Sequence, residues 1–160
     1  MENLLEKESV KRVSKFLKKF NSSLSVIVLE QTARTAKDAA NALKCEVGAI
    51  VKSLVFKADD SFLLCLIAGD KRCSLNKVKK ILNEKDVSMA SAEQVKEMTG
   101  FTIGGVSPVG HLNPIKIIID QSLSRFDNIF GAAGHPNCVF KINFTNLKKI
   151  TNGKVTDITE

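Results

Sequence analysis

The chain has 160 residues, of which 44% are hydrophobic and 26% are charged. This length and balance are typical of one globular domain with its own core, and they exclude disordered and fibrous classes. No apolar run approaches the ~20 residues that a membrane helix requires, and charges interrupt the N-terminal segment, so we expect no membrane contact and no signal peptide. We therefore expect a single domain over residues 1–160, located in the cytoplasm.

The net charge of +7 is the compositional feature that bears most on partners. An excess of lysine and arginine attracts polyanions such as RNA, but it also occurs in proteins whose basic surface is simply solvated. The chain has no run made only of lysine and arginine and no RGG repeat, which disfavours a disordered nucleic-acid-binding arm. Charge alone does not decide between the two interpretations.

Four cysteines are spaced 20, 8 and 65 residues apart, at Cys45, Cys65, Cys73 and Cys138. This spacing matches neither a zinc site nor a CxxC redox motif, so we expect reduced thiols. No local signature of a cysteine protease accompanies any of them, which disfavours a nucleophilic role.

The N-terminal part of the chain predicts two helices with a strand between them. Apolar residues recur at three- and four-residue steps over 9–20 with basic residues opposite, which predicts an amphipathic helix with Ser9 as a candidate N-cap. The β-branched run 24–29 predicts a short strand. Thr35 and the acidic residue three positions later resemble a capping arrangement, so a second helix should end near Lys44.

The middle of the chain predicts a buried hairpin followed by two peripheral helices. Segment 48–58 has the β-branched content of a core strand, and the Asp-Asp-Ser turn after it should fold it back onto 62–68. Because 62–68 is apolar at every position, we expect both of its faces to be covered. Amphipathic spacing over 74–82 and a capping pattern at the start of 91–100 predict the two helices.

The last third predicts short strands around two glycine-rich loops. We expect strands over 115–119, over 138–144 and near Val155, with a short segment at 123–126 and a helical turn opened by Thr145. The whole chain then has about six or seven strands and four or so helices in mixed order. Because there is no steady alternation of strand and helix, we predict an α+β fold class rather than a doubly wound parallel sheet.

Lys52 is the residue whose position most needs an explanation, because its charge interrupts the apolar strand predicted over 48–58. Moving an ammonium into a core is costly unless the charge is paired or neutralised. One interpretation is a strand-edge lysine that extends its charge to water. The other is a functional cation, since buried charges often mark sites.

Two glycine-rich segments downstream favour a functional site. GGVSPVGH at 104–111 has glycines that let backbone N–H groups approach a ligand, but a tight structural turn needs the same residues. GAAGHP at 131–136 is similar in composition and holds the only other histidine, His135. A lysine with two such loops can form a small concave site. The chain has no Walker, GxGxxG, HExxH or GxSxG motif, which disfavours nucleotide-binding folds, zinc proteases and α/β-hydrolases.

Three motifs in this order resemble the YbaK/EbsC family, the free-standing aminoacyl-tRNA deacylases related to the editing domain of bacterial prolyl-tRNA synthetases. They are CEVGAIVKSLVF at 45–56, TGFTIGGVSPVG at 99–110 and FGAAGHP at 130–136. The resemblance covers roughly residues 9–158. It implies a mixed, barrel-like β-sheet surrounded by helices, and hydrolysis of the ester that joins a mischarged amino acid to the 3′ end of a tRNA.

The resemblance also implies the site residues. The essential lysine of the family falls on Lys52, and no metal or other cofactor is expected. The expected substrate-binding residues are Ser53, Gly104, Gly105, Val106, Ser107, Pro108, Gly110, His111, Gly131, Ala132, Ala133, Gly134 and His135. Some relatives carry serine where this chain has Ala132 and Ala133, and tyrosine is absent, so the amino-acid specificity of a particular relative does not transfer.

The expected partners are the 3′ end of an aminoacyl-tRNA and, for tRNA specificity, prolyl-tRNA synthetase or another synthetase; no oligomeric state is predicted. We expect backbone N–H groups of the GGVSP segment to stabilise the developing oxyanion, with Lys52 acting as a cation or as a neutral general base. The alternative function is a non-catalytic module that binds a tRNA end or a synthetase with the same pocket.

Overall fold

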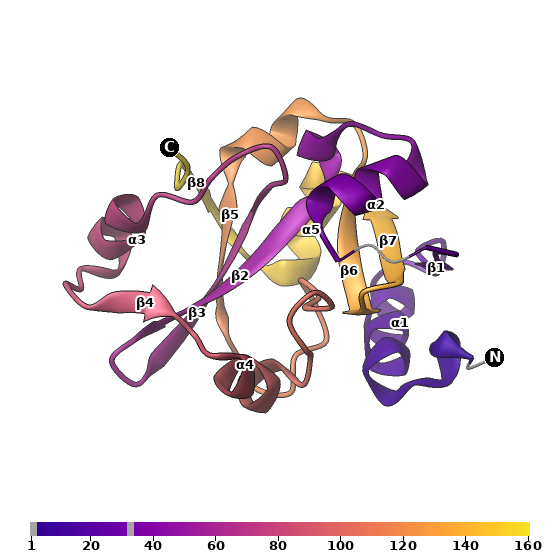
Figure 1. Ribbon diagram of the computed structural model, residues 1–160, viewed down its shortest axis with the longest axis horizontal. Helices are drawn as coiled ribbons and strands as arrows, with labels where there is room; N and C mark the ends of the chain where they lie inside the picture. Colours follow the sequence, from indigo (N-terminus) through magenta and orange to yellow (C-terminus); the bar gives the residue numbers. More distant parts are fainter. Residues whose placement is uncertain (1–2, 32–33) are drawn as a thin grey trace.

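The computed structural model describes residues 3–31 and 34–160. Within these ranges eight strands form two sheets with helices packed around them (Figure 1). The strands are β1 (Val26–Val28), β2 (Val51–Ala58), β3 (Ser61–Ala68), β4 (Val87–Met89), β5 (Lys116–Asp120), β6 (Ile129–His135), β7 (Cys138–Ile142) and β8 (Lys154–Thr156).

Five α-helices and three short 3-10 helices connect the strands in the described part of the chain. They are α1 (Glu8–Phe20), α2 (Ala36–Leu43), α3 (Leu75–Leu82), α4 (Ala92–Thr99) and α5 (Phe144–Thr151), with η1 (Leu4–Glu6), η2 (Val47–Ala49) and η3 (Gln121–Arg125). No helix among the described residues has the length and apolar character needed to cross a bilayer.

The larger sheet has the order β4-β2-β3-β5-β8 and mixes both kinds of pairing. β2 is antiparallel to β3 and β4, whereas β5 is parallel to β3 and β8 is parallel to β5. The smaller sheet, β1-β7-β6, is antiparallel throughout. A parallel bridge between Ile50 and Phe130 joins the start of β2 to β6, so the two sheets meet there.

This architecture confirms the α+β class, with two additions. Eight strands are present in the described ranges, rather than six or seven, because neither β4 nor β6 was predicted as a strand. Two of the three residues of β4 are exposed, so it carries little apolar signal. The strands of these ranges form two open sheets that meet at one corner and do not close into a barrel.

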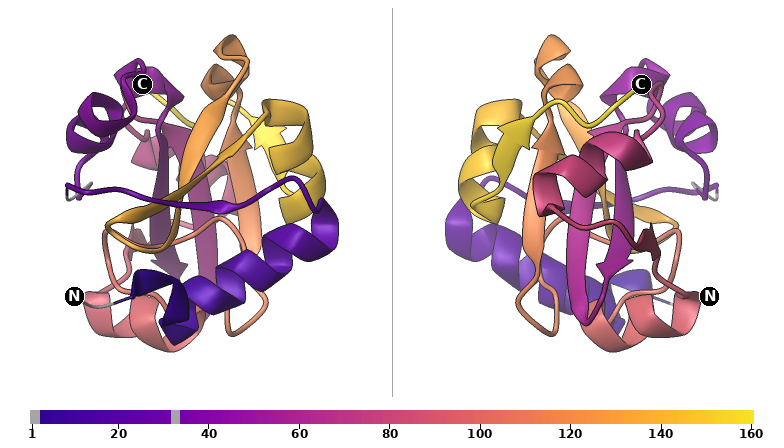
Figure 2. Two further views of the ribbon diagram at one scale, coloured as in Figure 1. Left: turned by 90° about the vertical axis from the view of Figure 1, so that its right-hand side faces the viewer. Right: turned by 90° about the vertical axis from the view of Figure 1, so that its left-hand side faces the viewer.

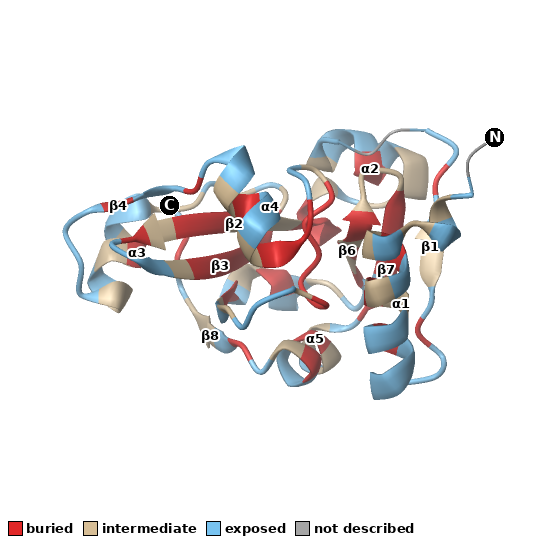
Figure 3. Ribbon diagram, turned by 90° about the horizontal axis from the view of Figure 1, so that it is seen from below, coloured by how far each residue is buried: buried red, intermediate tan, exposed pale blue. Residues whose placement is uncertain are grey.

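The hairpin of β2 and β3 lies at the centre of the core, as predicted. Along β3, Leu64 and Leu66 belong to one buried cluster, while Cys65 and Ile67 belong to another on the opposite face. Both faces of the strand are therefore covered, and Figure 3 shows the buried stretches of β2 and β3. Alternation of side chains between the faces of a strand explains why every position is apolar.

Local capping chemistry explains where several helices begin and end. The Thr35 side chain accepts a hydrogen bond from the N–H of Asp38, so α2 begins as predicted. Ser91 and Gln94 form a capping box at the start of α4, and Gly100 ends that helix with φ +80°.

Two predicted helix starts are wrong. Lys7, not Ser9, is the N-cap residue of α1, and the Ser9 hydroxyl instead donates to the carbonyl oxygen of Gly134 at 2.8 Å. Likewise Asn143 caps α5 through the N–H of Asn146, so the helix begins at Phe144 rather than at Thr145 and has two full turns.

The segment 131–136 is also not a loop: most of it belongs to β6. β6 pairs with β7 over Ile129–Ala132, and its register shifts between Ala132 and His135. Gly134, with φ +91°, lies at this irregularity against the backbone of Ser9, so β6 packs closely on α1 (Figure 2). The small residues therefore serve a β-bulge and a close strand–helix contact rather than a free loop.

Candidate functional site

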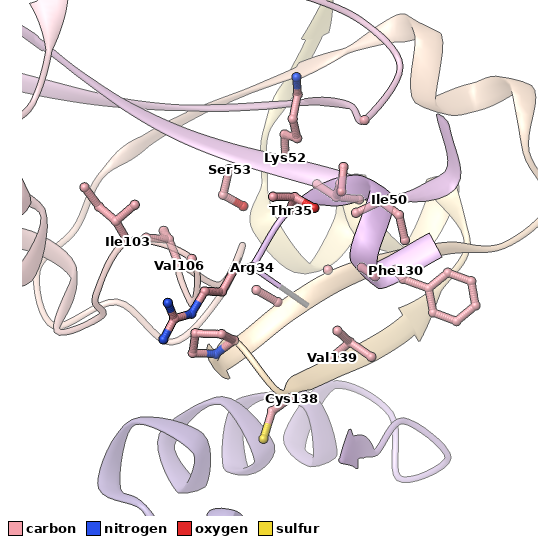
Figure 4. A pocket seen from close by; sticks show the side chains of 18 of the residues that line it. Arg34, Thr35, Ile50, Lys52, Ser53, Ile103, Val106, Phe130, Cys138 and Val139 are labelled. Carbon is pink, nitrogen blue, oxygen red and sulfur yellow. The ribbon is translucent and has the colours of Figure 1, made fainter. Parts of the chain in front are cut away.

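One hollow, called the main hollow because most of the predicted site residues that line any hollow line this one, opens where β2 begins, between α2, the segment before Val106, and the smaller sheet. It has a volume of about 410 Å³. Side chains that line it are shown in Figure 4. Its lining includes Arg34, Ile50, Lys52, Ser53, Leu54, Gly69, Ile103, Gly104, Val106, Gly131, Ala132 and Pro136.

Lys52 and Ser53 both border this hollow, but their side chains lie on opposite faces of β2. Successive side chains of a strand point to opposite sides, and Figure 4 shows the Lys52 ammonium pointing away from the Ser53 hydroxyl. Lys52 is half-buried, and it forms no ion pair with any other residue that the structure describes. The lining contains two cations, Lys52 and Arg34, and no described carboxylate, so the hollow suits an electron-rich or anionic ligand.

Ser53 holds the one buried side-chain polar atom without a hydrogen-bond partner in the described part of the chain. A buried hydroxyl without a partner loses its water contacts and gains nothing in return, which costs about 1–3 kcal/mol. Such atoms need an explanation, and a ligand that hydrogen-bonds the hydroxyl would provide one. The hydroxyl is directed into the hollow (Figure 4).

Gly104 and Val106, on either side of Gly105, form another part of the wall of the main hollow. The N–H of Gly105 already donates to the carbonyl of Thr102 at 2.9 Å, while the carbonyl of Gly105 accepts from the N–H of Gly134 at 3.1 Å. Gly104 has φ +96°, a conformation that favours glycine. In the ranges that the structure describes, no hydrogen bond uses the N–H groups of Gly104 or Val106, which leaves two donors at this wall.

The predicted site residues fall into two groups. Six line the hollow: Lys52, Ser53, Gly104, Val106, Gly131 and Ala132. The other eight do not line it: Gly105, Ser107, Pro108, Gly110, His111, Ala133, Gly134 and His135.

The second group has structural contacts that explain its location. Ala133 is fully buried in the core, and the buried Ser107 hydroxyl accepts from the N–H of Val109 at 3.1 Å. Gly105 and Gly134 lie directly behind the wall, where each packs on the backbone beyond it. Pro108, Gly110 and His111 instead line a separate hollow of about 340 Å³.

Neither histidine faces Lys52 across the main hollow. Nε2 of His111 donates to the carbonyl oxygen of Ser107 at 2.7 Å, and the ring packs edge-on against Phe101. Burial lowers the pKa of His111, so the neutral form is favoured. Nδ1 of His135 accepts from the N–H of Asn137 at 3.0 Å.

Several lining residues were not predicted from the sequence. Arg34 is exposed just before the cap of α2, and Ile103 is 62% exposed immediately before the glycine pair. An exposed isoleucine beside two glycines is a signal that could have been used, because large apolar side chains at a hollow often contact ligands. Arg34 had no such signal, since a lone arginine before a helix is usually solvated.

A second hollow, of about 540 Å³, adjoins the first on the ammonium side of β2. Lys52, Leu54 and Gly69 line both hollows. The remaining lining residues of the second hollow are Phe56, Asp70, Lys71, Arg72, Cys73, Leu75 and Met89. Both terminal guanidinium nitrogens of Arg125 donate to the Asp70 carboxylate, at 3.0 and 2.7 Å, which lowers the pKa of that carboxyl.

The described residues contain no group of three or more histidine, cysteine, aspartate or glutamate side chains placed to hold a metal ion. The expectation of no metal or cofactor stays a prediction.

Comparisons with known proteins give a consistent result. The family model described as aminoacyl-tRNA editing domain matches residues 30–150. The uncharacterized protein YwhH of Bacillus subtilis strain 168 is 30% identical over 148 residues, which is 92% of this chain and 94% of that protein. A proline–tRNA ligase of Bacillus velezensis is 37% identical over 100 residues, 62% of this chain but only 18% of the ligase.

A solved structure described as a candidate trans-editing enzyme for prolyl-tRNA synthetase is also similar. It has a TM-score of 0.91 and 37% sequence identity, over 96% of this chain and 98% of that chain.

Proposed function

Since the chain belongs to the aminoacyl-tRNA editing domain family, as its resemblance to YbaK/EbsC proteins predicted, we propose that it hydrolyses the ester bond of a mischarged tRNA. The observation that carries this proposal is that the matched region, 30–150, contains every residue named above as lining the main hollow. We propose tRNA-Pro, or a related tRNA that carries a small amino acid, as the substrate, because relatives include proline–tRNA ligases.

The proposed reaction is attack of water on the ester carbonyl, with release of the amino acid and of the tRNA 3′ hydroxyl. The N–H groups of Gly104 and Val106 are the proposed donors to the carbonyl oxygen as it becomes negative, because the N–H of Gly105 is already used by Thr102. A donor of this kind is worth about 3 kcal/mol in the transition state.

Lys52 is proposed as a cation rather than as a base. Its ammonium has no ion-pair partner among the described residues and lies beside the junction of the two hollows, where it can attract the ester or an adjacent phosphate. A ribose hydroxyl or a group of the substrate can assist the water. Ser53 is the proposed hydrogen-bond partner for the aminoacyl group, because its hydroxyl has no other partner.

We propose further that residues 1–160 act as one editing domain in trans, in the cytoplasm where tRNAs are charged. The ligase relatives suggest a synthetase that supplies the mischarged tRNA, and prolyl-tRNA synthetase is the proposed source. The chain spans 18% of the Bacillus velezensis ligase, so amino-acid activation is not part of the proposal.

The test is a panel of tRNA-Pro charged separately with alanine, serine, threonine, cysteine and 2-aminobutyrate. Each is incubated with a tenfold lower concentration of the protein, and free amino acid is counted over time. The proposal expects many turnovers on at least one small amino acid. Saturable binding of all five without release would support the alternative, a non-catalytic module for a tRNA end, and would overturn the enzyme assignment.

A further inference from the structure

The second hollow, on the ammonium side of β2, is larger than the first and is not used by the reaction above. It is bounded by β2, the turn that follows β3, the start of α3 and the edge strand β4. Because Lys52, Leu54 and Gly69 line both hollows, the two hollows adjoin along β2.

The charges of the second hollow suit a phosphate. It has three cations, Lys52, Lys71 and Arg72, and one carboxylate, Asp70. That carboxylate is already paired with Arg125, a residue outside the hollow, so it offsets little of the positive charge. Arg72 has one carboxylate neighbour, Glu160 at 4.0 Å, but both side chains are more than 60% exposed, and such contacts contribute little.

The walls of the same hollow suit a nucleobase. Leu75 and Met89 are 38% and 57% exposed, although both are large apolar side chains. They line the hollow from α3 and from β4, together with Leu54 and Phe56 of β2. Methionine is flexible and polarizable, and it packs well on flat aromatic ligands. A cationic rim over an apolar floor is typical of sites that hold one nucleotide.

We propose that the second hollow binds the terminal nucleotide of the tRNA, with its base against Leu75 and Met89 and its phosphate beside Lys71 and Arg72. This proposal rests on the proposed deacylase function, whose ester links an amino acid to that nucleotide. The amino acid then occupies the first hollow beside Ser53, and the ester lies at the junction beside Lys52. Lys52 contacts the substrate where the two hollows adjoin, and of the three residues that line both hollows it is the one with a charge.

The test is a binding cycle with two fluorescent RNA hairpins that copy an acceptor stem, one ending in CCA and one lacking the terminal adenosine. We expect the protein to bind the CCA hairpin at least tenfold more tightly. In the variant Leu75→Ala/Met89→Ala this preference should fall below threefold. The matched control is Leu112→Ala, an exposed leucine outside both hollows, which should keep the full preference.

The cations are tested by salt dependence. Each lost phosphate contact lowers the slope of log affinity against log salt by about 0.7 for single-stranded RNA. Lys71→Ala/Arg72→Ala should therefore lower the slope for the CCA hairpin by about 1.4. The same loss of two charges on α5, in Lys148→Ala/Lys149→Ala, gives the change to be expected from net charge alone, and an equal slope change in both variants would overturn the phosphate assignment.

The nucleotide site and the deacylase function can be refuted independently of each other. If Leu75→Ala/Met89→Ala keeps the full preference for the terminal adenosine while the wild type deacylates tRNA, the nucleotide site is wrong and the deacylase stands. If the preference falls as expected but no charged tRNA is turned over, the nucleotide site stands and the deacylase assignment is wrong.

Discussion

The backbone N–H of Gly134 donates a hydrogen bond to the carbonyl oxygen of Gly105, with 3.1 Å between nitrogen and oxygen. This bond ties the glycine pair at 104–105 to β6, and so it joins the two small-residue segments that the sequence placed at one site. A side chain at position 105 would point at the backbone of His135, since an added Cβ would lie 2.9 Å from both its N and its Cα. The wall of the main hollow depends on this close approach.

Substitution of Gly105 by alanine should therefore damage both stability and activity. Backbone atoms cannot move aside as a side chain can, so we expect a loss of about 2–3 kcal/mol in the free energy of unfolding, measured by urea titration. The matched change Gly104→Ala meets only Pro136 at 3.5 Å and should cost about 1 kcal/mol, from its positive φ. Equal losses in the two variants would contradict the packing argument.

The sequence predicted the hairpin and most helices well because their signals are local. The all-apolar stretch of β3 and the Thr35 and Ser91 caps each depend on residues a few positions apart. Ser9 and the segment 131–136 were misassigned because their contacts are to each other, across 125 residues of chain. Glycine and alanine there could equally belong to a loop or to a strand that packs closely on a helix.

Part of the candidate site could also be predicted. Lys52 and the glycine pair stood out by residue type, and they do lie together at the hollow. The sequence could not exclude His111 from the site. Its ring is hydrogen-bonded to Ser107, and the residue lines another hollow, which only the fold reveals. Adjacent residues of a strand lie on opposite faces, which separates Lys52 from Ser53, but spacing could not show that a hollow lies on each side of β2.

Ser53→Ala should separate stability from function. It removes a buried hydroxyl that has no partner, so the free energy of unfolding should be unchanged or higher by up to about 1 kcal/mol. If that hydroxyl binds the aminoacyl group, kcat/KM for deacylation should fall about tenfold, the value of one hydrogen bond. The same substitution at Ser107 leaves the N–H of Val109 unpaired and should cost about 1–3 kcal/mol. A stability loss in Ser53→Ala as large as that in Ser107→Ala would mean that Ser53 has a structural partner.

Lys52→Ala should abolish most of the deacylase activity while leaving the fold intact. The ammonium forms no ion pair with another described residue, so its removal costs the folded state little, whereas an electrostatic contact to the ester or phosphate is worth about 2–4 kcal/mol in the transition state. We expect kcat/KM to fall by about 30-fold or more on the best tRNA of the panel. Lys149→Ala, which removes the same charge from the exposed face of α5, is the control. Wild-type rates for Lys52→Ala on every charged tRNA would rule out the assignment.

Cys73 should be the most readily alkylated of the buried or half-buried thiols, for a reason that lies in its neighbour. The Cys65 thiol can stabilise the Cys73 thiolate by a hydrogen bond, which lowers the pKa of Cys73 and raises that of Cys65. A lowered pKa means that more thiolate is present at a given pH, and the thiolate is the reactive form. The pH midpoint of iodoacetamide labelling at Cys73, followed by peptide mass spectrometry, should therefore lie below 9.0, the ordinary thiol value.

Cys65→Ala tests that cause, because it removes the donor and leaves only burial and the nearby charges to act on Cys73. The midpoint at Cys73 should then move to higher pH, since the anion has lost its hydrogen bond. The pH midpoint is the right measure because easier access of iodoacetamide to Cys73, after the Cys65 side chain is shortened, would change the labelling rate by the same factor at every pH. Cys45, whose pKa is raised by burial and by Glu46, reports on the same sample and should keep its midpoint in both proteins. An unchanged midpoint at Cys73 in Cys65→Ala would show that the lowered pKa has another origin, with the Lys52 ammonium the next candidate because its charge also acts on Cys73.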